Sequence, residues 1–280
     1  MEPHELRRMF ALQERHCWYR ALRRRILAAL ERSGALAPRL GERAQPAAPL
    51  SPPPLCLDAG CGTGMLLAAL DGRARLLGLD RSELALALAR RRGLDRLVRA
   101  SVTEIPLRDA SQDIVVSADV LYHRDVRDDI GALREFARCL RPGGVLVLNL
   151  PAFGALRSTH DEAIHTARRY RAAEVRAKIE QAGLTPIEVR YWNWLLFPPI
   201  ALQRLLRRRS PSSRPRPRET SGAAAGTGPD SDLRPLPSWV NEPLGALLRL
   251  EERLDGLAGA IGLAAPAGLS VLAVARKGDR

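Results

Sequence analysis

The sequence is poor in lysine, in aromatic residues and in long apolar runs. Lys178 and Lys277 are the only lysines, so arginine supplies nearly all of the 44 basic residues and of the formal net charge of +13. Aromatic residues make up 4% of the chain against 46% for hydrophobic residues, so leucine, alanine and valine must fill the core. The most apolar segment, 195–202, is far shorter than the ~20 residues that a spanning helix needs, and the sequence predicts no such helix.

Cysteine is also scarce and shows no pattern. The four cysteines form no CxxC pair and have no zinc-ligand spacing, so we predict no metal site and free thiols in a reducing cytoplasm. The first ten residues, MEPHELRRMF, contain no apolar stretch of the signal-peptide type. We therefore predict a cytoplasmic protein, with peripheral contact to the inner face of the cytoplasmic membrane left open. The cysteines are Cys17, Cys56, Cys61 and Cys139.

The excess of arginine has two interpretations. Arginine keeps its charge when buried and makes forked hydrogen bonds to carboxylates and phosphates, so an anionic partner is one explanation. Such a partner would be a phosphorylated substrate, an anionic membrane or a nucleic acid. The other explanation is that the richness in alanine, arginine, leucine and proline reflects a GC-rich genome.

Short apolar segments alternate with helical segments from residue 55 onward. A helix over 5–32 and a proline-rich connector over 37–54 precede them. The alternation predicts an α/β protein whose parallel sheet carries helices on both faces and binds ligands beyond the carboxyl ends of its strands. The predicted strands are 55–58, 75–79, 97–100, 113–117, 145–149, 187–192 and 270–275, with helices over 65–70, 82–92, 127–140 and 172–182.

A long insertion separates the last two predicted strands. Residues 207–235 are rich in arginine, proline, serine and glycine, and we predict that they are disordered. Residues 243–262 predict an amphipathic helix, with a break at Gly256 or Gly259 left open. The apolar and basic residues of 194–209 suit an anionic membrane surface, and packing against another helix or a partner subunit is the alternative. The predicted units are a helical lid (1–36), a core (55–192 with 268–276) and the insertion (193–267).

A glycine-rich turn follows the first predicted strand directly. Its residues 58–64 read DAGCGTG, and glycines let a backbone turn tightly and approach a ligand closely. Asp58 would repel a pyrophosphate and suit a cofactor with positive groups, which disfavours a nicotinamide oxidoreductase. Asp80 ends the second strand, where an acid can accept hydrogen bonds from both ribose hydroxyls.

These segments resemble the class I S-adenosylmethionine-dependent methyltransferases. DAGCGTG, LGLD (77–80), DIVVSADVLYHRD (113–125) and LREFARCLRPGGVLVLN (133–149) match that family in wording, order and spacing. The resemblance implies a Rossmann-like, mostly parallel seven-stranded sheet with a helical insertion before the last strand, and S-adenosyl-L-methionine as cofactor. The cofactor-binding residues that it implies are Asp58, Gly60, Cys61, Gly62, Gly64, Asp80, Arg81, Ser101, Val102 and Asp119.

Two further stretches resemble bacterial methyltransferases associated with surface polysaccharides and lipid-linked glycans. They are ERHCWYR (14–20) and HDEAIHTARRY (160–170), and they imply a small-molecule or lipid-linked acceptor. A hydroxyl acceptor needs a base within hydrogen-bond reach, and an arginine pair suits a phosphate or carboxylate. The candidate catalytic residues are His160, His165, His123 and Tyr170, and the candidate substrate-binding residues are Arg168, Arg169, Trp18 and Tyr19.

Two other functions remain open at this stage. The positive charge favours a nucleic-acid methyltransferase, but SADV (117–120) stands after the fourth strand where base-amine methylases keep an N/D-P-P-Y/F element. A non-catalytic S-adenosylmethionine-binding module on the same fold is disfavoured by the intact glycines and Asp80, because such a protein has less reason to keep them.

Overall fold

The computed structural model describes residues 2–37, 52–157, 161–162, 164–209 and 235–279. Most of the proline-rich connector, and the part of the predicted disordered linker over 210–234, lie outside these residues. The linker was predicted to begin at residue 207, but a helix continues to Arg209.

The seven strands form one sheet in the order β3-β2-β1-β4-β5-β7-β6. All neighbouring strands are parallel except β7, which runs antiparallel to both β5 and β6. This confirms the predicted Rossmann-like sheet, in which the insertion precedes the last strand. The strands are β1 (Leu55–Ala59), β2 (Arg75–Asp80), β3 (Leu97–Arg99), β4 (Gln112–Ala118), β5 (Leu140–Pro151), β6 (Leu184–Trp192) and β7 (Ser270–Lys277).

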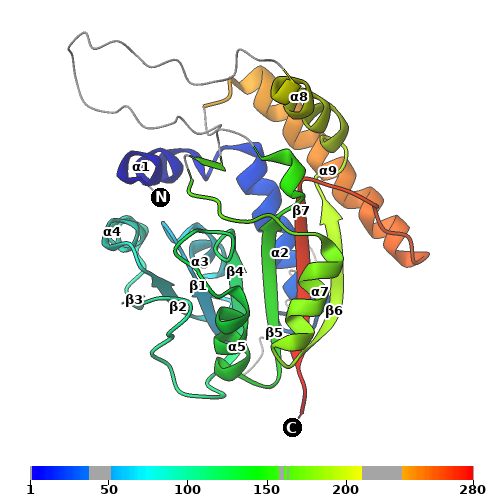
Figure 1. Ribbon diagram of the computed structural model, residues 1–280. Helices are drawn as coiled ribbons and strands as arrows, with labels where there is room; N and C mark the ends of the chain where they lie inside the picture. Colours follow the sequence, from blue (N-terminus) through cyan, green and yellow to red (C-terminus); the bar gives the residue numbers. More distant parts are fainter. Residues whose placement is uncertain (1, 38–51, 158–160, 163, 210–234, 280) are drawn as a thin grey trace, which may run out of the picture.

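Helices cover both faces of the sheet and its carboxyl end (Figure 1). In Figure 1, α1, α8 and α9 lie at the end toward which the parallel strands point, and α5 and α7 lie in front of the sheet. The helices are α1 (Pro3–Leu12), α2 (Cys17–Arg32), α3 (Met65–Leu70), α4 (Glu83–Arg90), α5 (Asp129–Cys139), α7 (Ala172–Gln181), α8 (Phe197–Arg209) and α9 (Ser238–Ala260), with a short 3-10 helix at Gly154–Leu156.

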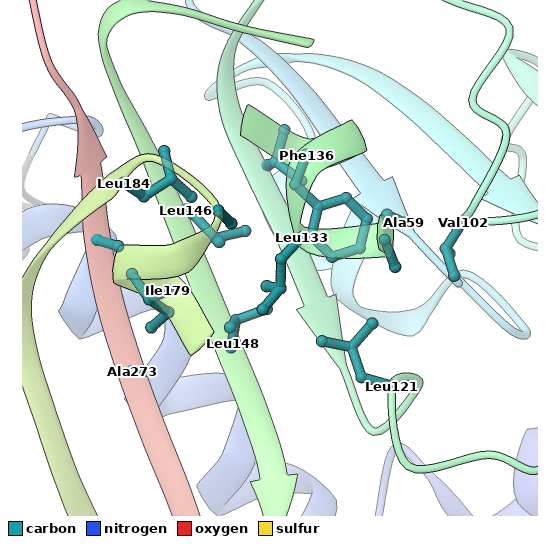
Figure 2. Packing of buried hydrophobic residues seen from close by; sticks show 14 of the residues in the cluster. Ala59, Val102, Leu121, Leu133, Phe136, Leu146, Leu148, Ile179, Leu184 and Ala273 are labelled. Carbon is teal, nitrogen blue, oxygen red and sulfur yellow. The ribbon is translucent and has the colours of Figure 1, made fainter. Parts of the chain in front are cut away.

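Two apolar cores hold these layers together, one on each face. Leu133 and Phe136 of α5 and Ile179 of α7 pack against Leu146 and Leu148 of β5 on the first face (Figure 2). On the second face, α2, α3 and α9 cover β1, β4, β5 and β7. The middle of β4 is fully buried, as its unbroken apolar run predicts. Leucine, alanine and valine fill both cores, as expected from the scarcity of aromatic residues.

Most elements lie within a few residues of their predicted bounds, and three of the larger differences are informative. The single helix over 5–32 is wrong, because the His16 side chain accepts a hydrogen bond from the Trp18 backbone and caps the start of α2. β5 begins at Leu140, which pairs with Gln112 before a register shift, although residues 141–144 have the composition of a turn. α9 begins before the predicted start and continues unbroken through Gly256 and Gly259.

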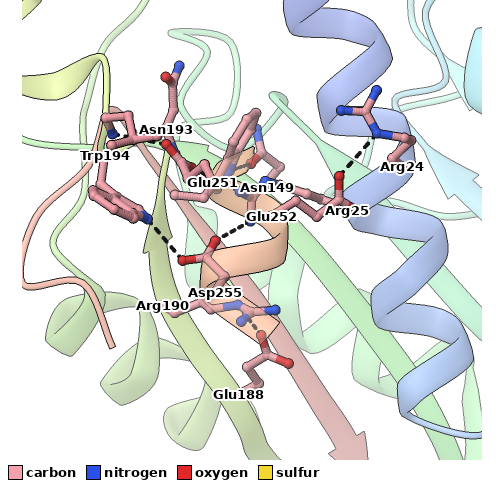
Figure 3. Close-up of polar contacts among 12 residues, drawn as sticks. Arg24, Arg25, Asn149, Glu188, Arg190, Asn193, Trp194, Glu251, Glu252 and Asp255 are labelled. Carbon is pink, nitrogen blue, oxygen red and sulfur yellow. Dashed lines mark hydrogen bonds and ion pairs between the residues drawn. The ribbon is translucent and has the colours of Figure 1, made fainter. Parts of the chain in front are cut away.

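A buried ion pair fastens the insertion to the N-terminal segment. Arg25 on α2 contacts Glu251 at 2.9 Å and Asp255 at 2.6 Å on α9, with 3% and 0% of the Arg25 and Glu251 side chains exposed. Glu251 also accepts hydrogen bonds from the backbone of Asn193 and Leu195 just after β6 (Figure 3). The two carboxylates therefore hold α2, α9 and the turn after β6 in one arrangement.

The insertion helices also bear on the membrane hypothesis. No helix in the described ranges is long and apolar enough to cross a membrane. Leu202 and Leu205 of α8 are exposed, whereas Trp194 is half-buried and donates its indole N–H to Asp255. Trp194 is therefore engaged with α9, and contact of the apolar residues of 194–209 with a membrane stays a prediction. The side chains of 207–209 lie outside what the structure describes.

We expect Glu251→Ala to lower the free energy of unfolding by about 3–5 kcal/mol, because it removes one of the two carboxylates that hold the buried Arg25 and the acceptor of two backbone N–H groups. The matched control is Glu242→Ala, which removes the exposed partner of Arg20 on the same pair of helices. That change should cost less than ~1 kcal/mol. Denaturant titration measures both, and equal losses would contradict a special role for the buried pair.

Candidate functional site

One cavity of about 790 Å³ runs along the carboxyl edge of the sheet. Its floor is the set of residues that end or follow the parallel strands, together with the first residue of the antiparallel β7, and its cover comes from α1, α2, α8 and α9. The floor residues, in the order of the sheet, are Asp80 (β2), Gly60 (β1), Asp119 (β4), Pro151 (β5), Ser270 (β7) and Asn193 (β6). The position agrees with the rule that open α/β sheets bind ligands at this edge.

The glycine turn after β1 forms one wall of the cavity. Gly60 and Gly62 have φ angles of 90° and 53°, which favour glycine, and both line the cavity. A side chain at Gly60 would clash with Val120, whereas one at Gly62 would meet only the Met9 methyl group at 3.4 Å. Gly64 does not line the cavity, and its missing side chain lets α4 approach closely. Its predicted contact with a cofactor is therefore corrected to a packing role.

Asp80 lies at the end of β2, as predicted, and is fixed by two backbone donors. Its Oδ2 accepts a hydrogen bond from Gly62 N at 2.9 Å, and its Oδ1 accepts one from Ser82 N at 2.8 Å. Burial raises the pKa of this carboxyl group, while these two donors oppose the shift. Each carboxylate oxygen keeps a further lone pair for a ligand in the cavity.

Asp58 is a buried carboxylate that faces the cavity with 3% of its surface exposed. None of the described residues donates a hydrogen bond to it, and burial together with the neighbouring Asp80 raises its pKa to about 7. A buried carboxylate is costly unless a positive group or a donor satisfies it. The site is therefore complementary to a ligand with a cationic group and repels a pyrophosphate.

Asp119 follows β4 in a left-handed conformation, with φ of 59°. Its backbone N–H donates to Asn149 O at 2.9 Å, and its carboxylate accepts from Asn149 Nδ2 at 3.1 and 3.2 Å. Burial raises the pKa of Asp119 to about 7, although Asn149 and Arg169 oppose the shift. Strained backbone of this kind persists where the surrounding structure holds it, often at functional sites.

Helices α1 and α2 cover the glycine turn from above. Trp18 and Tyr19 both line the cavity, with their rings edge to face at 4.9 Å. Gln13 Oε1 accepts a hydrogen bond from Thr63 Oγ1 at 2.5 Å, which joins the cover to the turn. Trp18 and Tyr19 thus line the cavity beside the glycine turn, while their covering of the cofactor and their part in binding a substrate stay predictions.

The candidate histidines occupy different environments. His123 lines the cavity, and its Nδ1 accepts a hydrogen bond from the Asp125 backbone at 3.2 Å. Burial lowers the pKa of His123 to about 4, so the ring is neutral at physiological pH. His165 lies beside it, at 5.6 Å between ring centroids, but faces Glu2 and does not line the cavity. His160 lies outside the described residues.

Four other predicted site residues are placed away from the cavity or already bonded. Tyr170 is buried, and its hydroxyl donates to Leu121 O and to the Asp129 carboxylate, so its catalytic assignment is corrected to a structural one. Arg168 donates a hydrogen bond to the Val126 carbonyl and forms an ion pair with Asp129. It is therefore not placed to bind a substrate in the cavity. Arg169 does line the cavity but makes a forked bond to Asp161. Ser101 bonds Thr103, and Val102 reaches the cavity in its place.

Polar cavity residues that were not among the predicted site residues include His16, Asp161, Thr166 and Asn193. The first three lie in the stretches 14–20 and 160–170 quoted above, but no role was predicted for them. The Oγ1 of Thr166 and the Oδ1 of Asn193 are buried and have no hydrogen-bond partner among the described residues. Asn193 has a positive φ angle of 60°. The only sequence signal for this conformation is that asparagine tolerates left-handed backbone better than most residues.

The remaining predicted contacts agree with the geometry. Cys61 and Arg81 both line the cavity beside the glycine turn. In the part of the chain that the structure describes, no group of three or more histidine, cysteine, aspartate or glutamate side chains could hold a metal ion. The cavity therefore combines a carboxylate that can accept hydrogen bonds at Asp80, an apolar wall at Val102 and a buried carboxylate at Asp58. Together these groups fit a nucleoside that carries a positive charge.

Comparisons with known proteins agree with this chemistry. Residues 57–148 match the family described as a methyltransferase domain. The chain is 38% identical over 134 residues to a probable S-adenosylmethionine-dependent methyltransferase of Mycolicibacterium smegmatis, covering 45% of this chain and 50% of that protein. It is 35% identical over 98 residues to a probable tRNA methyltransferase 9B of Mus musculus, covering 35% of this chain and 22% of that protein. The chain thus spans about half the length, or less, of these curated relatives.

A solved structure supports the fold alone. An S-adenosylmethionine-dependent methyltransferase of Archaeoglobus fulgidus aligns with a TM-score of 0.51 at 14% identity, covering 91% of this chain and 94% of that one. The matched domain contains the glycine turn, Asp80 and Asp119, which are the groups that surround the cofactor end of the cavity. Residues 57–148 are therefore a class I methyltransferase domain, whose cofactor is S-adenosyl-L-methionine.

Proposed function

We propose that this protein transfers the methyl group of S-adenosylmethionine to a small acceptor held inside the cavity. The observation that carries the proposal is the continuity of the cavity, which begins at Asp58 and Asp80 and continues past Asp119 over three more strands. A cofactor bound at the first end leaves walled space beside it for a second molecule. Aligning two molecules in one cavity is the main contribution that such an enzyme makes to the rate.

Each residue of the cofactor end has a role that its geometry suits. Asp58 would bind the ammonium group of the methionyl part, and Asp80 would accept hydrogen bonds from the ribose hydroxyls. Val102 would pack against the adenine, and Trp18 and Tyr19 would exclude water from above. The bound sulfonium supplies an already activated methyl group, so the protein needs chiefly to hold and orient both partners.

Asp119 is our candidate for the group that holds a proton of the acceptor. It lies where the cofactor end meets the rest of the cavity, and its pKa of about 7 suits proton exchange near neutral pH. His123 was an alternative, but its Nδ1 lone pair is taken by the Asp125 backbone N–H. In this neutral ring Nε2 then carries the proton, so neither ring nitrogen is placed to remove a proton from an acceptor.

The proposal also concerns the chemical class of the methyl acceptor. A small molecule or a lipid-linked glycan suits an enclosed cavity, whereas RNA requires an open basic surface that reaches several phosphates. Of the four arginines in the described cavity wall, Arg169 and Arg204 are bonded to Asp161 and to the Leu156 carbonyl, and the other two are Arg23 and Arg81. The activity in the name of the mouse relative belongs to that protein, of which the match covers 22%. We therefore favour a small acceptor over a nucleic acid.

We expect Asp80→Asn to weaken the binding of S-adenosylmethionine and S-adenosylhomocysteine by about 10-fold to 100-fold, because a charged acceptor of hydrogen bonds is worth about 1.5–3 kcal/mol. Ser101→Ala is the matched control, since Ser101 was assigned to the same site by resemblance but bonds Thr103 instead. Titration calorimetry should show unchanged affinity for this control. Failure of the intact protein to bind either ligand would refute the proposed function.

Asp58 should make cofactor binding release protons. Its pKa is raised to about 7, so the folded protein holds this proton through a pH range in which an ordinary aspartate has lost it. A cationic ligand favours the ionised carboxylate, so binding near pH 6 should release up to about one proton. Calorimetry in buffers of different ionisation enthalpy measures the release, and Asp58→Asn should abolish the share that comes from this group.

The same raised pKa has a consequence for the ligand-free protein. Between about pH 4 and pH 7 the folded state binds more protons at Asp58 than the unfolded state does, so this group's contribution to stability falls as the pH rises. Asp58→Asn should therefore remove this decline and raise the melting temperature relative to the unchanged protein at pH 8. A melting temperature that the substitution lowers equally at pH 5 and pH 8 would contradict the assignment.

A further inference from the structure

The cavity is larger than its cofactor end, and the rest of it is apolar. Beyond Asp119 it passes over β5, β7 and β6, which is three strand spacings or about 14 Å. Helices α2, α8 and α9 roof this part. We call it the apolar arm, and its walls include Leu22, Ile26, Leu196, Ile200, Leu244 and Leu248.

The walls of the apolar arm come from two segments that are distant in sequence and firmly joined. Leu22 and Ile26 lie on α2, while Leu244 and Leu248 lie on α9, and the buried Arg25–Glu251 pair fixes these helices against each other. A second link is made by Asn241, which accepts from Cys17 N at 2.9 Å. The arm is therefore a built feature of the fold, because its walls are held by buried polar contacts.

A few polar residues interrupt this apolar surface, among them Arg204 of α8, Ser270 of β7 and Asn193. Asn193 lies at the end of β6 with 3% of its surface exposed, and it lines the cavity. Its Oδ1 is buried without a hydrogen-bond donor among the residues that the structure describes. Buried acceptors are nearly always satisfied, so this atom indicates an occupant that brings an N–H or O–H group.

We propose that the methyl acceptor is an amphiphile whose apolar chain occupies the apolar arm and whose polar part reaches Asp119 and the cofactor end. This inference rests on the proposed function and names the substrate class for the same site. An apolar chain removes the arm's surface from water and needs no hydrogen bonds there, apart from one donor for Asn193. A purely polar acceptor would leave this apolar surface uncovered.

Two other occupants fit the observations less well. A flat membrane surface would contact the exposed outer residues Leu202 and Leu205 of α8, whereas the arm residues face inward. Residues 210–234 of this chain lie between α8 and α9 in sequence, but Leu233 is their only large apolar residue. A separate molecule with its own apolar chain is therefore the occupant that the walls match.

Chain length provides the first test. We would titrate hexyl, octyl and decyl glucosides, each below its micelle concentration, into the full-length protein saturated with S-adenosylhomocysteine. Each added methylene should strengthen binding by about fourfold, the equivalent of ~0.8 kcal/mol per buried CH₂, until the arm is full. Affinity that does not change with chain length would overturn the inference.

Paired substitutions provide the second test. Ile200→Asn and Leu244→Gln place a polar group on the arm wall and should weaken octyl glucoside binding by about tenfold or more. Their controls are Leu205→Asn on α8 and Leu250→Gln on α9, at exposed positions of the same helices, which should change affinity by less than about twofold. Asn193→Gly keeps the left-handed backbone and is a further control, because the chain end of an alkyl glucoside carries no donor for the lost acceptor, and affinity should change by less than about threefold.

The affinity for S-adenosylhomocysteine separates the two levels of the proposal. All five variants should keep it, which also shows that they are folded. If the intact protein fails to bind this ligand, the proposed function fails; if it binds the ligand but no glucoside, only the amphiphile inference fails. Loss of chain-length dependence in Leu205→Asn but not in Ile200→Asn would overturn the inference in favour of contact with a membrane surface.

Discussion

The buried contact between Arg25 and the carboxylates of Glu251 and Asp255 is the interaction on which the upper half of the molecule depends. The parallel sheet alone would leave its carboxyl edge open to water. Arg25 also lies over the Trp192 ring, and the Trp192 indole donates to Asn149, which in turn donates to Asp119. A continuous series of contacts therefore connects the buried Arg25 ion pairs with Asp119 on the floor of the cavity. The same network positions the helices that cover the cavity and the Asp119 side chain.

Two buried carboxylates in the cavity lower the stability of the ligand-free protein. Asp58 and Asp119 are buried carboxylates whose pKa is raised to about 7, and Asp58 lacks a donor among the described residues. Charges in such places destabilise the empty protein and are repaid when a complementary ligand binds. The same reasoning explains the left-handed backbone at Asp119, since strain of this kind is tolerated where position matters more than stability.

The sequence predicted what local chemistry controls. The alternation of apolar strands and helices specified the sheet, and the residues that follow β1 and β2 specified the cofactor end, because the carboxyl ends of parallel strands share one edge. Contacts between distant segments were not accessible in this way. Tyr170 and Arg168 contact Asp129, which is distant from both in the sequence, instead of lining the cavity. The residues adjacent to either side chain give no indication of these contacts. The pairing of α2 with α9, and hence the apolar arm, depends on long-range burial of Arg25 that one sequence does not reveal.

Helix α2 contributes to both ends of the cavity, with Trp18 and Tyr19 over the cofactor end and Leu22 and Ile26 in the apolar arm. A shift of this helix toward a ligand at one end would also move it relative to a ligand at the other. Movement of that kind would couple the occupancy of the two ends, and thermodynamic reciprocity requires that each ligand then alter the affinity for its neighbour by the same factor. Turnover by such a protein would show synergy between cofactor and acceptor in the order and tightness of their binding, and release of the demethylated cofactor would depend on whether the acceptor's chain has already left.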